Sequence, residues 1–331
     1  MKPTIYVYGL CDVFYDAYYI KGLTDYFGNI KIIFNVDKFP DFNQEVFAAI
    51  ILDHGKETKF IIDSRDQNDI LDQELQWCDV YGKVNYNVEA LPKVNTHKIL
   101  PIGPSFGIKI WNIPQTIFYA VMNFVKFYPK ITKKRKFLAN YKAQTTRFKL
   151  EDYTNDFEVK PKYIYFTGST WKFDYETNAN RAKFVEVCKS LPEIEFEGGL
   201  APRNDNFDTG FKHLEIKKRV PLEVYMQKIK QTTLTFNTPA VLKCHGWKLG
   251  EFLALGEVIL STPHVNVLPA PLIDHVHILY VHDENDMKNT ILKIINDEHL
   301  RKKIQANAKA YFDEYLAPHQ VIKRMYALNN K

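Results

Sequence analysis

Residues 245–263 constrain the fold of this chain more than any other stretch. They read HGWKLGEFLALGEVILSTP, in which Gly246 opens a helical pattern, Gly256 stops it, and an apolar strand follows. Unpaired N–H groups at a helix start attract an anion, and glycines such as Gly250 let a backbone approach a ligand closely. Glu251 stands in the first turns, where a carboxylate can bind two neighbouring hydroxyls, as it does in ribose recognition. The pattern predicts a site for a nucleotide; an ordinary helix–strand unit with capping glycines is the alternative.

Length and composition indicate a two-domain globular protein. The 331 residues exceed the roughly 250–300 that one core usually supports. Four cysteines lie far apart without a CxxC pair, which argues against a disulfide framework or a zinc site and favours free thiols in a reducing compartment. No basic-then-apolar leader opens the sequence, and no apolar run approaches the roughly 20 residues that span a bilayer. We therefore expect a cytoplasmic protein, or one peripheral to a membrane.

Strands and helices alternate in the first half of the chain. The apolar patterns predict strands over residues 4–8, 30–34, 48–52, 59–62, 78–81 and 98–102, and helices over residues 13–26 and 69–76. Such alternation implies βαβ units and a parallel sheet, with ligands bound beyond the carboxyl ends of the strands. Gly9, Asp53, His54 and Asp63 follow predicted strands and are expected at that edge.

The second half repeats the α/β alternation after a different middle segment. Residues 115–150 are apolar, then basic, with helical spacing. Beyond them we predict strands over residues 163–166, 194–197, 232–236, 258–261 and 278–281, with helices over residues 178–190, 221–230 and 246–255 and further helices to residue 329. The fold class predicted from these patterns is α/β.

Four stretches resemble GT-B glycosyltransferases. Residues 251–262 (EFLALGEVILST) resemble the EAMAxGxPVIxT stretch of that family and, more loosely, its exostosin-like and group 1 members from bacterial surface-polysaccharide clusters. Residues 311–320 (YFDEYLAPHQ) resemble the bend before the last helix of the fold. Residues 79–86 (DVYGKVNY) and the Ile102-Gly-Pro turn look like the end of an exostosin-like N-terminal domain.

The resemblance implies two Rossmann-like domains that face each other across a cleft, with a C-terminal helix that crosses back to the N-terminal domain. We therefore predict an acceptor-side domain over residues 1–155, with the basic helical segment near 115–150. A nucleotide-sugar-binding domain should cover residues 156–312, and the returning helix residues 313–331.

The resemblance also implies roles for residues around the opening stretch. Glu251 would bind the donor ribose, and the backbone from Gly246 to Gly250 would face the pyrophosphate. Many retaining members carry a second Glu seven residues earlier; here the spacing falls on Lys243 and Cys244, so a retaining mechanism that relies on that Glu is not implied. His245 or Lys243 could take over part of its role.

The departing diphosphate requires positive charge. Lys172, Arg181 and Lys248 are the candidates, with solvated surface charges as the alternative interpretation. The predicted donor-binding residues are Gly168, Lys172, Arg181, His245, Gly246, Trp247, Lys248, Gly250 and Glu251.

No metal or other cofactor is predicted. The Asp-x-Asp metal motif of the other large glycosyltransferase fold does not stand out in this sequence. His264, His275, His277 and His282 lack both the helical i, i+4 pairing and the companion carboxylates of a metal site. We expect them to be ordinary histidines of loops and strand ends.

An inverting transfer would need a general base near the acceptor hydroxyl. Asp12 and His54 are the candidates by position in the N-terminal half. Each has a plain structural alternative: Asp12 as the N-cap of the following helix, and His54 as a turn residue.

The middle of the chain is strongly basic. No acidic residue lies between Glu89 and Glu151, and the interval holds Lys133, Lys134, Arg135 and Lys136 at its centre. A solvated surface is one interpretation; docking on an anionic membrane face, with the apolar helix of residues 117–128 as a peripheral anchor, is the second. Nucleic acid is not predicted as a partner, because no recognised binding motif is present.

The predicted function is that of a metal-independent glycosyltransferase. It would move a sugar from a nucleotide-sugar donor to a hydroxyl of a surface glycan or a lipid-linked glycan precursor, as in lipopolysaccharide or capsule synthesis. One alternative is a GT-B-like scaffold that has lost its site and binds a partner. A sugar-nucleotide epimerase is the other, disfavoured because few paired acids lie near Glu251.

Overall fold

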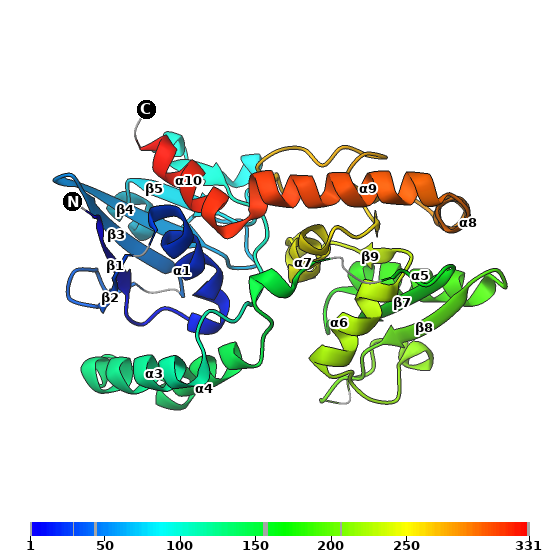
Figure 1. Ribbon diagram of the computed structural model, residues 1–331, viewed down its shortest axis with the longest axis horizontal. Coiled ribbons are helices and arrows are strands. Elements are labelled where there is room, and N and C mark those ends of the chain that lie inside the picture. The colour runs from blue at the N-terminus through cyan, green and yellow to red at the C-terminus, as the bar shows by residue number, and fades with distance from the viewer. Residues whose placement is uncertain (1, 29, 43–44, 155–157, 206, 330–331) are drawn as a thin grey trace. The chain divides into compact units, whose positions relative to one another are not determined.

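A computed structural model describes residues 2–28, 30–42, 45–154, 158–205 and 207–329 (Figure 1). The fold is α/β, as the sequence predicts. The chain forms two compact units. Unit 1 comprises Met1–Tyr153, Val267–Ala270 and Asp313–Lys331, and unit 2 comprises Thr154–Asn266 and Pro271–Phe312.

A six-stranded sheet forms the centre of unit 1, with strand order β2-β1-β3-β4-β5-β6. Its core includes fully buried apolar residues of the three central strands, such as Ile5, Ile51 and Phe60. The strands are β1 (Thr4–Tyr8), β2 (Ile32–Asn35), β3 (Phe47–Asp53), β4 (Lys56–Asp63), β5 (Val80–Lys83) and β6 (Ile99–Pro101).

The sheet of unit 1 is mixed, which corrects the expectation of a parallel sheet. β3 pairs antiparallel with both β1 and β4, whereas β2, β1, β4, β5 and β6 run in one direction. His54 and Gly55 turn the chain between β3 and β4 with φ angles of 47° and 80°, which is typical of tight hairpins. A parallel return needs about a dozen connecting residues, and the two strands are separated by only these two.

The helices of unit 1 cover its sheet. They are α1 (Val13–Phe27), α2 (Asp72–Trp77), α3 (Ile113–Phe127), α4 (Lys134–Thr145) and α10 (Pro318–Leu328), with short 3-10 turns at Val88–Ala90, Thr96–Lys98 and Leu150–Asp152. The last helix, α10, packs beside α1 (Figure 1). A π-helical turn, Phe312–Leu316, leads into α10, and the Tyr18 hydroxyl of α1 donates a hydrogen bond to the Leu316 carbonyl at 2.7 Å.

Parallel strands make up unit 2, as the sequence predicts. β7 (Tyr163–Gly168) pairs with β8 (Glu195–Leu200), and β10 (Ile259–Ser261) lies between β9 (Thr235–Asn237) and β11 (Leu279–Tyr280). The amide of Thr233 donates to the Tyr163 carbonyl at 2.7 Å and links the two groups of strands. The helices are α5 (Tyr175–Ser190), α6 (Leu222–Gln231), α7 (Trp247–Leu255), α8 (Glu284–Asn296) and α9 (Glu298–Tyr311), with short turns at Lys212–Leu214 and Val241–Lys243.

Residues 245–263 form the predicted helix and strand. α7 starts after Gly246 and ends at Gly256, whose φ of 68° lies in the left-handed region that favours glycine. Seven consecutive residues, Leu249–Leu255, are buried in α7, so this helix is packed on all sides in its second half. β10 follows in the middle of the parallel strands, and all three of its residues are buried. The start of α7 therefore lies on the side of the carboxyl end of β9, the strand that precedes it in the chain.

The basic middle segment forms two helices of unit 1. The side chains of Asn112 and Gln115 form a capping box at the start of α3. Pro129 follows the end of α3, and α4 begins five residues later at Lys134. Within the described part of the chain, the structure contains no helix that is both long and apolar enough to cross a bilayer.

Candidate functional site

Three cationic side chains of unit 2 converge on one loop. The loop follows β7; the carbonyl of Thr167, near the end of the strand, accepts a hydrogen bond from Lys248, and that of Ser169 in the loop accepts one from Arg181. Arg203 donates to the next carbonyl, that of Thr170. The three cations come from α7, from α5 and from the segment after β8. Since this loop lies at the carboxyl end of a parallel strand, the cations are gathered where α/β sheets bind ligands.

Gly168 makes room for one of these cations. A Cβ atom at this position would lie 2.7 Å from the Phe166 ring and 3.2 Å from Cδ of Arg181. The glycine therefore lets the Arg181 side chain run along the end of β7. Asp174 caps α5 by accepting from the Thr177 amide at 3.0 Å, and this cap fixes the helix that carries Arg181.

Burial lowers the pKa values of two of the cations, and for Lys248 the charge of Arg181 adds to the effect. Burial lowers the pKa of Arg181 to about 10, which leaves the guanidinium charged at neutral pH. Burial and then the charge of Arg181 lower the pKa of Lys248 to about 7, and the nearby Glu251 carboxylate opposes this shift. Glu251 is itself buried, with 6% of its surface exposed. A cationic cluster thus lies beside one buried acid.

A cavity of about 620 Å³ opens beside the same loop. Its lining includes Thr170, Lys172, Arg203, Asp205 and Arg219. Both oxygens of Asp205 accept from Arg203, at 2.8 and 2.7 Å, and Lys172 lies 3.2 Å from the same carboxylate. Lys172, Arg203 and Arg219 thus line the cavity together with a single acid, Asp205. The buried Thr170 hydroxyl has no hydrogen-bond partner among the described residues. The cavity suits a ligand that is anionic and accepts hydrogen bonds.

Polar side chains also gather at the ends of β9, β10 and β11. The Asn237 amide donates to the Ser261 hydroxyl and to Nε2 of His264, each at 3.0 Å. Nδ1 of His264 then carries the proton and donates to the Tyr280 hydroxyl at 3.1 Å. Burial lowers the pKa of His264 to about 4, so this ring is neutral at physiological pH. The His245 ring lies 5.6 Å from it, which joins this cluster to the start of α7.

The four histidines considered for metal binding do not gather. His277 accepts from the Ile273 amide at 3.0 Å, and His275 lies 3.7 Å from Asp274. Across the residues that the structure describes, no three His, Cys, Asp or Glu side chains are close enough together to hold a metal ion.

Unit 1 contains a separate pocket lined by carboxylates. Asp12, Asp16 and Glu45 line it together with Lys136, and its volume is about 590 Å³. Asp12 accepts from the Phe14 amide at 3.1 Å and so caps α1, while its other oxygen lies 3.8 Å from Lys136. Burial raises the pKa of Asp12, and burial together with the Asp12 charge raises the pKa of Asp16 well above its usual range. Two neighbouring acids with raised pKa values can hold and accept protons.

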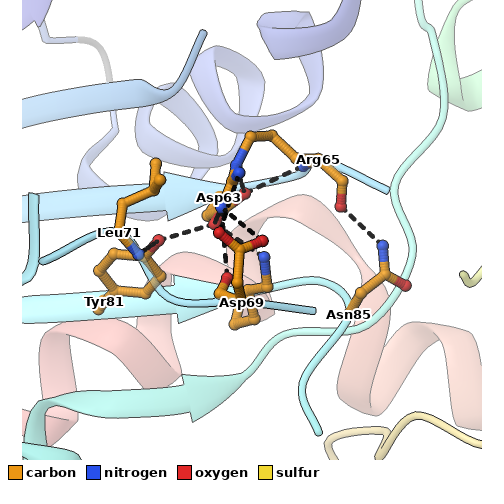
Figure 2. Close-up of polar contacts among 7 residues, drawn as sticks. Asp63, Arg65, Asp69, Leu71, Tyr81 and Asn85 are labelled. Carbon is orange, nitrogen blue, oxygen red and sulfur yellow. Dashed lines mark hydrogen bonds and ion pairs between the residues drawn. The ribbon is translucent and has the colours of Figure 1, made fainter. Parts of the chain in front are cut away.

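Asp63, another acid at this edge of the sheet, belongs to a buried network (Figure 2). It accepts from the Tyr81 hydroxyl at 2.7 Å, from Lys83 at 2.8 Å, and from Arg65 through both oxygens. Burial alone would raise the pKa of Asp63, but the hydrogen bonds and charges of Arg65 and Lys83 outweigh it and lower the pKa. Asp63 is fully paired inside unit 1 and serves the structure rather than proton transfer.

His54 and Asp12 lie at opposite ends of the strands of the sheet. Because β3 is antiparallel to β1, its carboxyl end lies beside the start of β1 at Thr4. His54 projects there from the β3–β4 turn, 77% exposed and 2.8 Å from Asp53. The structure therefore does not bring the two predicted bases together, and only Asp12 lies in a pocket with other carboxylates.

No protein-family model and no curated protein sequence matches the chain, whereas solved structures with partial similarity to it are known. The glycosyltransferase from Rickettsia africae ESF-5 is similar with a TM-score of 0.45 and 11% identity, over 94% of this chain and 73% of that one. The C-terminal domain of LpcC, a group 1 glycosyltransferase from Francisella tularensis, has a TM-score of 0.32 and 14% identity, over 47% of this chain and 86% of the other.

The third similar protein is TarM. A variant of S. aureus TarM in complex with fondaparinux, α-GlcNAc-glycerol and UDP has a TM-score of 0.43 and 10% identity, over 88% of this chain and 63% of that chain. Another TarM structure, with a TM-score of 0.40 and 13% identity, matches 53% of this chain. The match spans only 36% of that TarM chain. The activity proposed for the present chain therefore rests on its own residues.

Most of the predicted donor-binding residues lie in one region of unit 2. Gly168, Arg181 and Lys248 meet at the loop after β7, and Lys172 lines the adjoining cavity. His245, Gly246, Trp247, Gly250 and Glu251 lie at the start of α7 or in its first turns.

Sequence reasoning missed Arg203 and the Asn237–His264–Tyr280 cluster. Arg203 follows β8, and Asn237 and Tyr280 are the last residues of β9 and β11. Arg203 and Asn237 follow strands that the sequence predicted, and Tyr280 lies one residue before the end of another. Their positions after parallel strands were the available signal, since ligands bind beyond those ends.

The pKa of Lys248 predicts a pH-dependent affinity for diphosphates. A bound diphosphate stabilises the charged amine, so the pKa in the complex lies above the value of about 7 in the free protein. Affinity should therefore be complete below that pH and fall by about tenfold per unit as pH rises above it. Calorimetric titration of UDP from about pH 6 to about pH 9 measures this. Lys248→Arg should flatten the profile, and a flat profile in the unsubstituted protein would contradict the prediction.

Proposed function

We propose that this chain is a glycosyltransferase that uses a nucleotide-sugar donor. The observation that carries the proposal is the convergence of Lys248, Arg181 and Arg203 at the end of β7 and on the loop after it, with the buried carboxylate of Glu251 near Lys248. Clustered cations at the carboxyl edge of parallel strands suit a diphosphate, and a nearby carboxylate suits the hydroxyls of a ribose. Neighbouring side chains thus suit both the diphosphate and the ribose of a nucleoside diphosphate.

Unit 2 would bind the donor and stabilise its departure. Arg181 and Lys248 would contact the diphosphate, with Lys172 and Arg203 on the cavity side. When the bond between the anomeric carbon and the diphosphate oxygen breaks, these cations offset the charge that develops on the leaving group. The dipole of α7 also favours an anion at the start of this helix, in the same region. This arrangement supports transfer without a metal ion.

Unit 1 would handle the acceptor. The Asp12 carboxylate would take the proton of the acceptor hydroxyl as its oxygen bonds to the anomeric carbon. Its raised pKa makes it a better base than an exposed aspartate. A direct displacement of this kind inverts the anomeric centre, and it fits a chain with Cys244 where retaining members carry an acid. We propose that the acceptor is a surface glycan or its lipid-linked precursor and that the reaction takes place at the cytoplasmic side.

Nucleotide binding is the first test of this function. A ligand of the native state raises the melting temperature, by an amount equivalent to about 2.7 kcal/mol at a concentration of 100 times Kd. We expect one of UDP, GDP, CDP, ADP or dTDP to raise the melting temperature of the protein. Glu251→Ala should remove most of that shift, because the ribose loses its hydrogen-bond acceptor.

Two further variants sharpen this test. Glu223→Ala removes an exposed carboxylate from α6 of the same unit and should leave the shift unchanged. Gly246→Ala adds a Cβ that meets only Ala240, 3.6 Å away, so the protein should stay stable. The added methyl group should still reduce nucleotide binding, because it hinders the close approach of the pyrophosphate to the backbone. Absence of any shift with all five nucleotides would sink the transferase and favour a scaffold. Release of nucleoside diphosphate from nucleotide sugars with water as acceptor then distinguishes catalysis from binding.

A further inference from the structure

Helix α3 of unit 1 buries two polar side chains together with Phe127 and exposes an apolar face. Its buried face carries Thr116 and Asn123, and Asn123 donates to the buried Tyr141 hydroxyl of α4 at 2.8 Å. Gln144 of α4 donates to the Thr116 hydroxyl at 3.3 Å on the same side. These polar contacts, together with the rings of Phe124 and Phe137 at 6.3 Å between centres, hold α3 against α4, and the two helices lie side by side (Figure 1).

The outer face of α3 is apolar. Ile117 is 58% exposed, Phe118 61% and Val125 69%, and the exposed apolar residues of the helix are Ile113, Ile117, Phe118, Val121, Met122 and Val125. At 100° per residue these side chains cover about half of the helix circumference. No charged residue lies between Ile113 and Val125. A contiguous exposed face of this kind marks an interaction site.

Exposed cations border one end of this face. Tyr128, half-exposed just beyond α3, has the Lys134 amine 4.6 Å from its ring centre. Lys133, Lys134 and Arg135 are exposed and form no ion pair with any residue that the structure describes. Lys136 differs from its neighbours, because it lies 2.6 Å from Glu45 and faces the carboxylate pocket of unit 1. Three of the four residues of the basic run are therefore available to an anionic partner.

Charge decides between the possible occupants of this surface. A second copy of the chain would place one basic, acid-free segment against another, since no Asp or Glu occurs between Glu89 and Glu151. An anionic lipid surface supplies both the apolar layer that the outer face of α3 requires and the negative headgroups that complement Lys133, Lys134 and Arg135.

We propose that α3 docks this chain on an anionic lipid surface. The helix lies in the plane of the membrane interface with Ile117, Phe118 and Val125 among the acyl chains, and Lys133, Lys134 and Arg135 contact the headgroups. The anchor is thus chiefly the apolar face of α3, and the basic run assists it. This inference does not depend on glycosyl transfer.

Co-sedimentation with vesicles of equal parts phosphatidylglycerol and phosphatidylcholine tests this proposal. The unsubstituted protein should bind them, and binding to pure phosphatidylcholine should be weaker. Phe118→Glu with Val125→Glu should lower the partition coefficient by about tenfold or more, because two charges would enter the acyl region. Val88→Glu with Val94→Glu is the matched control, since both sites are exposed in unit 1, at 62% and 67%, and lie outside α3.

Each outcome decides the question. The proposal is supported if the α3 variant keeps its melting temperature but loses vesicle binding, while the control variant binds in full. Failure of the unsubstituted protein to bind, or equal losses in variant and control, overturns it. Sedimentation as a dimer that becomes monomeric in the α3 variant also overturns it and assigns the face to a second copy. The nucleotide-induced thermal shift is read separately, so failure of docking and failure of donor binding are distinguishable.

Discussion

Replacing Asp12 with asparagine should lower the turnover number by about 10²- to 10⁴-fold, the range that general-base catalysis contributes. The substitution removes the proton acceptor but leaves the fold intact, because asparagine also caps helices well and can accept from the Phe14 amide as Asp12 does. The donor Km should change little, since no donor-binding residue is proposed in unit 1. Steady-state release of nucleoside diphosphate measures both parameters.

Neighbouring acids provide the controls for this experiment. Glu45→Gln removes the exposed partner of Lys136, and Asp66→Asn removes another acid of the same pocket. Both should retain turnover within about tenfold, because neither is the proposed base. A large loss with Glu45→Gln and none with Asp12→Asn would move the base to Glu45. Full activity in all three variants would exclude this pocket from the chemistry.

Removal of the Asp63 carboxylate should destabilise unit 1 by about 3–5 kcal/mol. Asp63→Ala would leave the Lys83 ammonium inside the protein without its partner, and both side chains are fully buried. It would also remove the acceptor of the Tyr81 hydroxyl and of Arg65 (Figure 2). Urea denaturation should show a lower midpoint with little change in slope.

An exposed member of the same network supplies the control. Asp69, which is 58% exposed and contacts Arg65 at 3.4 Å, should change stability by less than about 1 kcal/mol when replaced by alanine. The lowered pKa of Asp63 sets the pH dependence. Its stabilising contribution is present above the unfolded pKa of about 3.9 and is lost as pH falls through the lower folded value. Equal effects of Asp63→Ala and Asp69→Ala would contradict a buried role for Asp63.

Local patterns in the sequence predicted the helices and strands well. The strand Thr4–Tyr8, the helix that starts at Val13 and the glycine-bounded helix α7 all occur where periodicity and capping residues place them. What periodicity left open was strand direction. Only two residues, His54 and Gly55, separate β3 from β4, and this spacing permits an antiparallel return alone.

The candidate site was predicted in part. Gly168 was predicted because it follows a predicted strand, and Arg181 and Lys248 because a departing diphosphate requires positive charge; the structure gathers all three at the end of β7. Arg203 was missed because its role depends on β8 lying beside β7. His54 was grouped with Asp12 because the direction of β3 was taken to be parallel.

The basic segment was likewise predicted only in part. Composition predicted an apolar helix and a basic run, but the sequence alone does not tell which face of such a helix is buried. Only packing on α4 buries Asn123 and leaves Val125 exposed, and only the fold brings Lys136 to Glu45.

The sequence by itself determined the α/β class, the extent of most elements and the residue types available at each strand end. These properties depend on local periodicity, capping and loop length. The tertiary structure decided which strand ends lie together, which cations share a loop and which face of α3 meets the solvent. Those properties depend on contacts between residues far apart in the chain, such as Lys248 with Thr167, and no local pattern encodes them.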